Sequence, residues 1–319
     1  MKGIKKSLKK NIKRTSYPIT ACLFTLLGHL VRKMSREQAL KFGRLLGYLA
    51  FDGLKIRRNM VLKNLKYAFP EKTEKEIQQV ARQAYVNQAR NVIELLRIPL
   101  IRDEQDAREL LDIHADESFY KTMSQNRGAV VVSAHLSSWE AIGVCAGLLL
   151  RPLHLIVKPL KNKRLDNTLN HLRTLHGNKT IHKDRALRVG INALESGGIV
   201  VILGDQAKRK AGFSMCFLGR QASVSLGPAF LTLKAGVPLF VEKCKILENG
   251  KYLLDIREIF TSDLTCTRED IRTLTIRYTR ELEDFIRAHP QEWLWLHNRW
   301  KPPKPSKSKA FKAGSTKEV

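Results

Sequence analysis

Two patterns of apolar residues divide the chain at about residue 128. Before that point, residues 35–111 carry apolar side chains at the three- and four-residue spacing of helices that bury one face. Ser35 with Gln38, and Thr73 with Glu76, match the capping-box pattern that begins such helices. We therefore expect a helical region over residues 35–111.

After residue 128, short runs rich in Val and Ile alternate with helical stretches. GAVVVSAH, HLIVKP and GIVVILGD are typical of buried strands. The expected elements around them are helices over 140–150, 162–176, 184–196 and 228–235, a hairpin turning at Asn249–Gly250, and a long helix over 267–289. This alternation predicts an α/β fold with right-handed crossovers and a largely buried sheet. We expect residues 112–301 to form this core, in one domain with the helical region.

The two ends of the chain differ from the core. MKGIKKSLKKNIKR is followed by the apolar run YPITACLFTLLGHLV, which is shorter than the roughly 20 residues of a spanning helix. No cleavage site of small residues follows the run. We expect residues 1–34 to be an uncleaved membrane anchor, with a buried first helix as the alternative. Residues 302–319 are expected to be a disordered basic tail.

The charge balance indicates an anionic partner. Lys and Arg number 57 against 30 Asp and Glu, which gives a net charge of +27. Nucleic acid, an anionic membrane and a phosphorylated substrate are the candidates. Because the chain has no aromatic-studded RNA-binding pattern, zinc finger or helix-turn-helix, we expect no nucleic acid. The five cysteines are scattered, so we expect reduced thiols, no metal site and no bound cofactor.

One pair of residues suggests catalysis. His135 ends a predicted buried strand, and Glu140 stands in the first turn of the next predicted helix. A glutamate folded back against the ring would hold one N–H, and the other nitrogen could remove a proton from an acceptor hydroxyl. The spacing alone also fits a histidine at a strand end and a glutamate that supports a helix N-terminus. Both interpretations stay open at this point.

Longer blocks resemble a known family. SAHLSSWE resembles the H-x-x-N-W-E block of the bacterial lipid A late acyltransferases, with Ser138 where that family usually has asparagine. Further blocks resemble the same family in the same order, namely RRNMVLKNLKYAFPE, KPLKNKRLDNTLNHLRTLHGNKTI, VVILGDQAKRKAGFSMCFLGRQASVSLGPAFLTLKAGVPL and HPQEWLWLHNRWK. The resemblance covers nearly the whole chain.

The resemblance implies a glycerol-3-phosphate-acyltransferase-like mixed sheet flanked by helices. It implies acyl transfer from an acyl carrier protein or coenzyme A thioester to a hydroxyl of a lipid A precursor. The expected location is the cytoplasmic face of the inner membrane, whose anionic surface is a further partner. A surface with a charge of +27 would also attract an acidic carrier protein.

The resemblance also implies roles for single residues. His135 becomes the general base and Glu140 its orienting partner. The substrate-binding candidates are Arg164 or Arg173, Asp205 with Gln206, and Ser138 with Trp139. Asp205 is expected to hold an arginine, and Trp139 to lie beside the acyl chain. The terminal tryptophans Trp293, Trp295 and Trp300 are expected in the core or at the membrane interface.

Two alternatives remain. Another membrane lipid, such as a lysophospholipid, an amino-acid lipid or a phosphoinositide mannoside, could be the acceptor. A non-catalytic basic protein that binds membrane or nucleic acid is the alternative from a different class.

Overall fold

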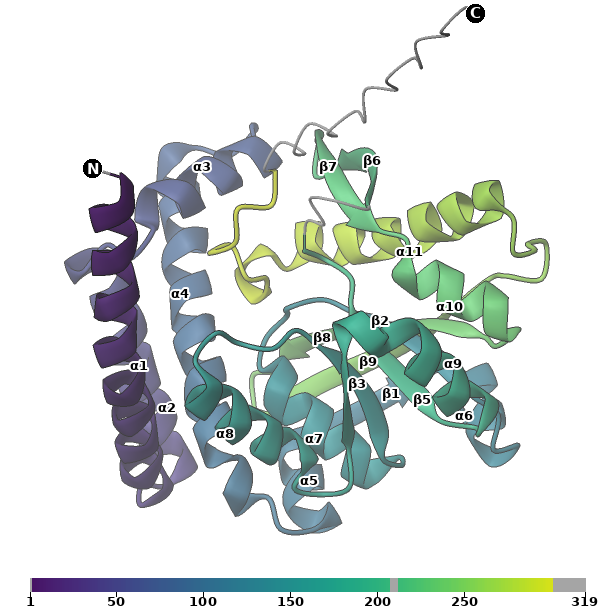
Figure 1. Ribbon diagram of the computed structural model, residues 1–319, viewed down its shortest axis with the longest axis horizontal. Coiled ribbons are helices and arrows are strands. Elements are labelled where there is room, and N and C mark those ends of the chain that lie inside the picture. Colours follow the sequence, from purple (N-terminus) through teal and green to yellow (C-terminus); the bar gives the residue numbers. More distant parts are fainter. Residues whose placement is uncertain (1, 207–211, 301–319) are drawn as a thin grey trace, which may run out of the picture.

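A seven-stranded sheet forms the centre of the computed structural model, which describes residues 2–206 and 212–300 (Figure 1). The strand order is β1-β9-β8-β2-β5-β3-β4, and the five strands from β8 to β4 are parallel. β9 is antiparallel to β8 and β1 is parallel to β9, so the predicted mixed sheet is confirmed. The sheet strands are β1 (Leu111–Ala115), β2 (Ala129–Ser133), β3 (Leu153–Val157), β4 (Lys179–His182), β5 (Ile199–Leu203), β8 (Leu239–Ile246) and β9 (Tyr252–Ile259).

Right-handed crossovers decide which helices cover each face of the sheet. α7 and α8 connect β2 to β3 and β3 to β4 in one direction, whereas α9 leads back to β5 and covers the opposite face. α10 packs on α9, and α11 packs on α10. The helices of the core are α5 (Glu104–Leu110), α6 (Glu117–Ser124), α7 (Trp139–Leu149), α8 (Lys163–Thr174), α9 (Ala186–Glu195), α10 (Gly227–Ala235) and α11 (Arg268–Ala288).

The predicted helical region forms a layer beside the sheet. It contains α1 (Lys2–Arg32), α2 (Arg36–Tyr48), the π-helical turn η1 (Leu49–Gly53), α3 (Arg58–Ala68) and α4 (Glu74–Arg97). α4 is central, since it contacts α1, α2 and α3 as well as α7 (Figure 1). Both predicted capping boxes, at Ser35 and Thr73, are present.

One hydrophobic core joins the two regions. Its buried members extend from Phe51 in η1 to Trp295 near the end of the described chain. β2, with the sequence AVVVS, is buried at every position because helices cover both of its faces. α1 and α2 add a smaller cluster against α4, which contains Val31, Ala39 and Ile93. The end of β2 is therefore held rigidly.

Some elements lie outside the sequence-based prediction. β1 and α6 lie between residues 111 and 124, β4 is a short strand at the sheet edge, and β6 (Gly212–Phe217) pairs with β7 (Arg220–Ser225) in a separate hairpin. These strands are edge or hairpin strands, so their sequences lack the continuous apolar runs of β2 and β5. The predicted tail, 302–319, lies outside the described residues.

The predicted anchor forms most of α1. Across residues 2–206 and 212–300, no helix combines the length and the apolar character needed to cross a bilayer.

The contact between α2 and α4 gives a test of the helical layer. A Cβ added at Gly47 would lie 2.6 Å from the Cα of Val86, so the helices would have to separate. We expect Gly47→Ala to lower the free energy of unfolding by about 1–3 kcal/mol in urea titrations. Gly143→Ala in α7 is the control, because a Cβ there meets nothing within 4 Å. Equal stability of the two variants would contradict the close approach of α2 and α4.

Candidate active site

His135 and Asp205 meet because their strands are neighbours. Ser133 of β2 pairs with Leu203 of β5, so the residues two positions further leave the sheet side by side at its carboxyl edge. His135 Nδ1 lies 2.7 Å from Asp205 Oδ1. The second oxygen, Oδ2, accepts the indole N–H of Trp293 at 2.8 Å. Both carboxylate oxygens of Asp205 are thus occupied.

Electrostatics assign the protons of this pair. Burial opposes ionisation of Asp205, but the attraction of His135 and the hydrogen bonds from His135 and Trp293 outweigh it and lower its pKa from 3.8 to about 2. Asp205 is therefore a carboxylate at neutral pH, and Nδ1 must donate its N–H. In a neutral imidazole the other nitrogen, Nε2, is then the proton acceptor.

Two side chains surround the imidazole of His135. The Gln206 side-chain nitrogen lies 3.1 Å from His135 Nε2, which fits an amide N–H donated to the unprotonated ring nitrogen. The ring of Trp139 meets the imidazole edge to face, with centroids 5.0 Å apart. The His135 side chain is 17% exposed, so the site is partly open. A hydroxyl that bound Nε2 would take the place of the Gln206 amide.

Glu140 has a different partner from the one predicted. Its carboxylate forms a two-pronged ion pair with Arg173 of α8, through Arg173 Nε at 2.7 Å and through Nη2. Arg173 Nη1 also donates to Asn170 at 3.3 Å. Such paired N–H···O bonds fix the plane of the guanidinium. Glu140 therefore orients Arg173.

The predicted contacts of the two carboxylates are corrected by this geometry. Glu140 was expected beside His135, and Asp205 was expected to hold an arginine, but each makes the contact predicted for the other. α7 begins at Trp139, and its first turn brings Glu140 to α8. Asp205 reaches His135 through the register of β2 and β5, a relation that sequence spacing does not express.

The other predicted residues divide into near and distant ones. Arg173 lies at the site, whereas Arg164 is an exposed residue nearer the start of α8. Ser138 is buried, and its hydroxyl donates to the Tyr252 hydroxyl of β9 at 2.7 Å. The position where the resembling family has asparagine thus anchors the loop to the sheet.

The C-terminal segment contributes a contact that the sequence did not predict. Trp293 was expected in the core or at a membrane interface; it is buried, but its indole N–H also holds Asp205. Leu136 and Trp293 form an isolated antiparallel β-bridge, and the N–H of Leu294 donates to the His135 carbonyl at 3.1 Å. The only signal in the sequence was the terminal tryptophan block itself.

Two of the five cysteines, Cys145 and Cys244, are buried, and the other three are exposed. No group of three or more His, Cys, Asp or Glu in the described part of the chain is arranged to hold a metal ion. Burial raises the pKa of the Cys145 thiol to about 12 and also raises that of Cys244, so both are protonated at neutral pH. Cys244 donates to the carbonyl of Leu136 at 3.2 Å. Neither of these two buried thiols is therefore a nucleophile at neutral pH.

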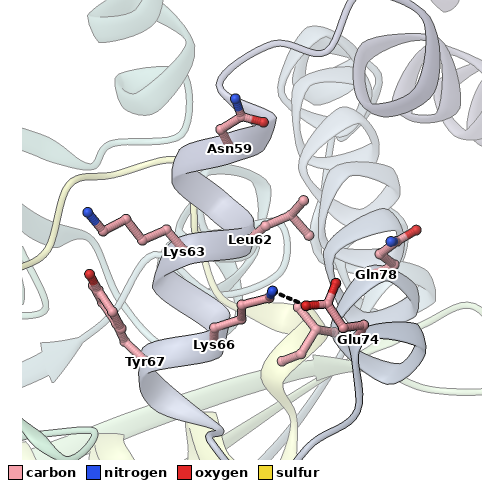
Figure 2. Close-up of a pocket in the computed structure, with 8 residues that line it drawn as sticks. Asn59, Leu62, Lys63, Lys66, Tyr67, Glu74 and Gln78 are labelled. Atoms are coloured by element: carbon pink, nitrogen blue, oxygen red, sulfur yellow. Dashed lines mark hydrogen bonds and ion pairs between the residues drawn. The ribbon is translucent and has the colours of Figure 1, made fainter.

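A surface depression of about 290 Å³ lies apart from these groups, between α3 and the start of α4. Figure 2 shows Lys63 and Tyr67 on one side of α3, and Lys66 turned toward Glu74. Leu62 and Ile77 also line it, and none of the predicted site residues does. Its rim carries Lys63 and Lys66 together with Glu74, which forms an ion pair with Lys66.

The ionised Asp205 makes stability depend on pH. Its folded pKa of about 2 lies below 3.8, so its stabilisation is fully present above pH 3.8 and is lost as the pH falls toward 2. At about 1.4 kcal/mol per pKa unit, roughly 2–3 kcal/mol should disappear. Urea titrations of the wild type and Asp205→Asn should show a stability difference that shrinks across this window. A difference that does not depend on pH would contradict the assignment.

Known proteins resemble the chain over most of its length. A family model described as bacterial lipid A biosynthesis acyltransferase matches residues 5–302. The lipid A biosynthesis lauroyltransferase of Escherichia coli is 25% identical over 260 residues, which cover 80% of this chain and 83% of that protein. The palmitoleoyltransferase of lipid A biosynthesis from the same organism is 23% identical over 262 residues, covering 81% and 83%.

A relative whose name gives a different acceptor lipid also matches. The phosphatidylinositol mannoside acyltransferase of Mycobacterium tuberculosis is 23% identical over 217 residues, covering 65% of this chain and 66% of that protein. All of these relatives are acyltransferases, and the match of the family model confirms the resemblance noted in the sequence. The chain therefore belongs to the bacterial lipid A biosynthesis acyltransferase family.

Proposed function

We propose that the protein transfers a fatty acyl chain from a thioester donor to a hydroxyl of a lipid A precursor, with His135 as the general base. One observation carries the proposal. Asp205 holds Nδ1 of His135 and leaves Nε2 as a proton acceptor at the carboxyl edge of the sheet. The lipid A enzymes among the relatives support the class of acceptor.

The proposed reaction needs one base. Nε2 of His135 takes the proton of the acceptor hydroxyl while the oxygen attacks the carbonyl carbon of the thioester. The tetrahedral intermediate collapses, the C–S bond breaks, and the leaving thiolate takes the proton back from the imidazolium. Asp205 stabilises the imidazolium between these steps. The products are the ester and the free thiol, without a covalent enzyme intermediate.

Arg173 is proposed to bind an anionic group of a substrate. Its guanidinium is held rigidly by Glu140 and is only partly exposed, which favours electrostatic binding in a partly desolvated site. Phosphates are present in lipid A and in both candidate donors. In this account Glu140 acts on the substrate through Arg173, while Asp205 acts on the acceptor through His135.

The donor is proposed to be an acyl carrier protein or coenzyme A thioester. Both are anionic, and the net charge of +27 would attract either one. Lys63 at the depression on α3 belongs to this cationic surface, whereas Lys66 beside it is paired with Glu74 (Figure 2). A mannosylated phosphoinositide is the second candidate acceptor, and the mannoside acyltransferase relative favours it.

The inner membrane is the proposed location, with the cytoplasmic face as the side of contact. Nine of the fifteen large hydrophobic side chains that are exposed in the described residues lie between Ile19 and Ile56. Those on α1, spaced at helical intervals, are Ile19, Leu23, Leu26 and Leu30, and those on α2 and the turn after it include Leu45, Leu49 and Leu54. Exposed cations, Lys33, Lys41 and Arg44, accompany them. An apolar face with adjacent cations suits the interface of an anionic bilayer.

If His135 is the general base, substitutions at the site should lower acyl-transfer activity to different degrees. His135→Ala should lower kcat about 10²–10⁴-fold, because the base is removed. Asp205→Asn should lower kcat to a similar degree, because the amide favours the imidazole tautomer in which Nε2 carries the proton. Glu140→Gln should mainly raise KM, because Arg173 loses its ionic partner. Free thiol and acylated lipid are measured with each thioester donor and a lipid A precursor. A His135→Ala variant within twofold of the wild-type rate would exclude the proposed base.

The membrane proposal predicts a local effect on binding. Leu23→Gln with Leu26→Gln should reduce sedimentation with anionic vesicles at least several-fold, because two apolar side chains leave the interface. Leu187→Gln with Phe260→Gln is the matched control, since both residues are exposed but lie outside α1 and α2. Equal binding by the two double variants would contradict a membrane contact through α1.

A further inference from the structure

Ser137 has the unusual backbone conformation of the loop that carries His135. Its φ is +47°, in the left-handed region that side chains other than glycine rarely adopt. The residue lies two positions after His135, between the end of β2 and the start of α7. Such a conformation persists only where the surroundings impose it. The contacts of Ser137 should therefore reveal what holds the loop in place.

Glu292 supplies the two shortest hydrogen bonds of Ser137, whose hydroxyl also lies 3.5 Å from the carbonyl oxygen of Cys244. The N–H of Ser137 donates to the main-chain carbonyl of Glu292 at 2.9 Å. The Ser137 hydroxyl donates to Oε2 of the same residue. Glu292 is 6% exposed and belongs to the 3₁₀ turn η4 (Pro290–Glu292). A buried carboxylate is costly unless hydrogen bonds satisfy it, so its placement at this loop calls for a role.

The residues after Glu292 extend the same pairing toward the base. Glu292 faces Ser137, Trp293 bridges Leu136, and the N–H of Leu294 binds the carbonyl of His135. Residues 292–294 thus run antiparallel to residues 135–137. Trp293 also holds Asp205, so one short segment fixes both members of the His135–Asp205 pair.

We propose that Glu292 is a positioning residue for acyl transfer, whose carboxylate fixes Ser137 and thereby the direction of the His135 imidazole. The inference rests on the proposed role of His135 as base. Without the carboxylate, the main chain at Ser137 can relax toward negative φ, which turns the loop and moves Nε2. Because Glu292 is only 6% exposed, we expect it not to touch the substrates, and its effect to appear in kcat.

Little free space remains around Ser137 and Glu292 while the carboxylate is present. A cavity of about 10 Å³ adjoins it, which has room for about one water molecule. Its lining includes Arg90 and Tyr252 as well as Ser137 and Glu292. Removing the carboxylate therefore leaves the Ser137 hydroxyl with the more distant carbonyl of Cys244, at 3.5 Å, and solvent as its acceptors.

The test compares Glu292→Ala, Glu292→Gln and Ser137→Ala in the acyl-transfer assay. Glu292→Ala should lower kcat about tenfold or more and leave both KM values within about twofold. Glu292→Gln should recover to within about threefold of the wild type, because its amide oxygen still accepts from Ser137. Glu283→Gln is the control, since Glu283 is a partly buried carboxylate of α11 that pairs with Arg287. It should not change kcat.

A double-variant cycle separates positioning from general stability. If Glu292 acts through Ser137, Ser137→Ala with Glu292→Ala should be no slower than the slower single variant. Additive losses, or a Glu292→Ala kcat within twofold of the wild type, would overturn the inference. If Glu292→Ala does not fold, an unchanged kcat in Ser137→Ala overturns it instead. His135→Ala is assayed in parallel, and full activity of this variant would refute the proposed base. If His135→Ala is inactive and Glu292→Ala is fully active, only the inference about Glu292 is refuted.

Discussion

The buried carboxylate of Asp205 is the constraint on which the site depends. A charge at that depth has to be paired and hydrogen-bonded, or it would be protonated. His135 satisfies one oxygen and Trp293 the other, so the end of β5, the loop after β2 and the C-terminal segment are joined at one point. The same pairing sets the tautomer of His135. The demand for pairing thus produces both local rigidity and a directed base.

The two carboxylates of the site have separate tasks. Asp205 is fully enclosed and acts on the imidazole, whereas Glu140 is slightly exposed and orients the Arg173 guanidinium. In the proposed reaction, one carboxylate prepares a proton acceptor and the other prepares an anion-binding group. Helical elements connect this site to the outer layer, since α4 contacts α7 on one side and α1 and α2 on the other. The exposed apolar side chains of α1 and α2 lie on that outer layer.

The sequence predicted the strands and helices whose patterns are strong. The buried runs at β2, β3 and β5, the capping boxes at Ser35 and Thr73, and the family blocks indicated the fold, and they placed His135 just after β2 as the structure has it. The partner of His135 was missed because strand order decides it: β2 and β5 are distant in sequence and adjacent in the sheet. The sequence placed both His135 and Asp205 directly after buried strands. It did not show that these two strands are neighbours in the sheet. The contacts of Trp293 and Glu292 depend on tertiary packing, which hydrophobic periodicity does not encode.

The central claim is that Asp205, and not Glu140, holds Nδ1 of His135. Nuclear magnetic resonance of ¹⁵N-histidine-labelled protein tests it directly, with His135→Ala used to assign the signal. At neutral pH the account predicts a protonated Nδ1 with a strongly hydrogen-bonded proton, which Asp205→Asn shifts and Glu140→Gln leaves in place. A His135 signal that responds to Glu140→Gln and ignores Asp205→Asn would contradict the account.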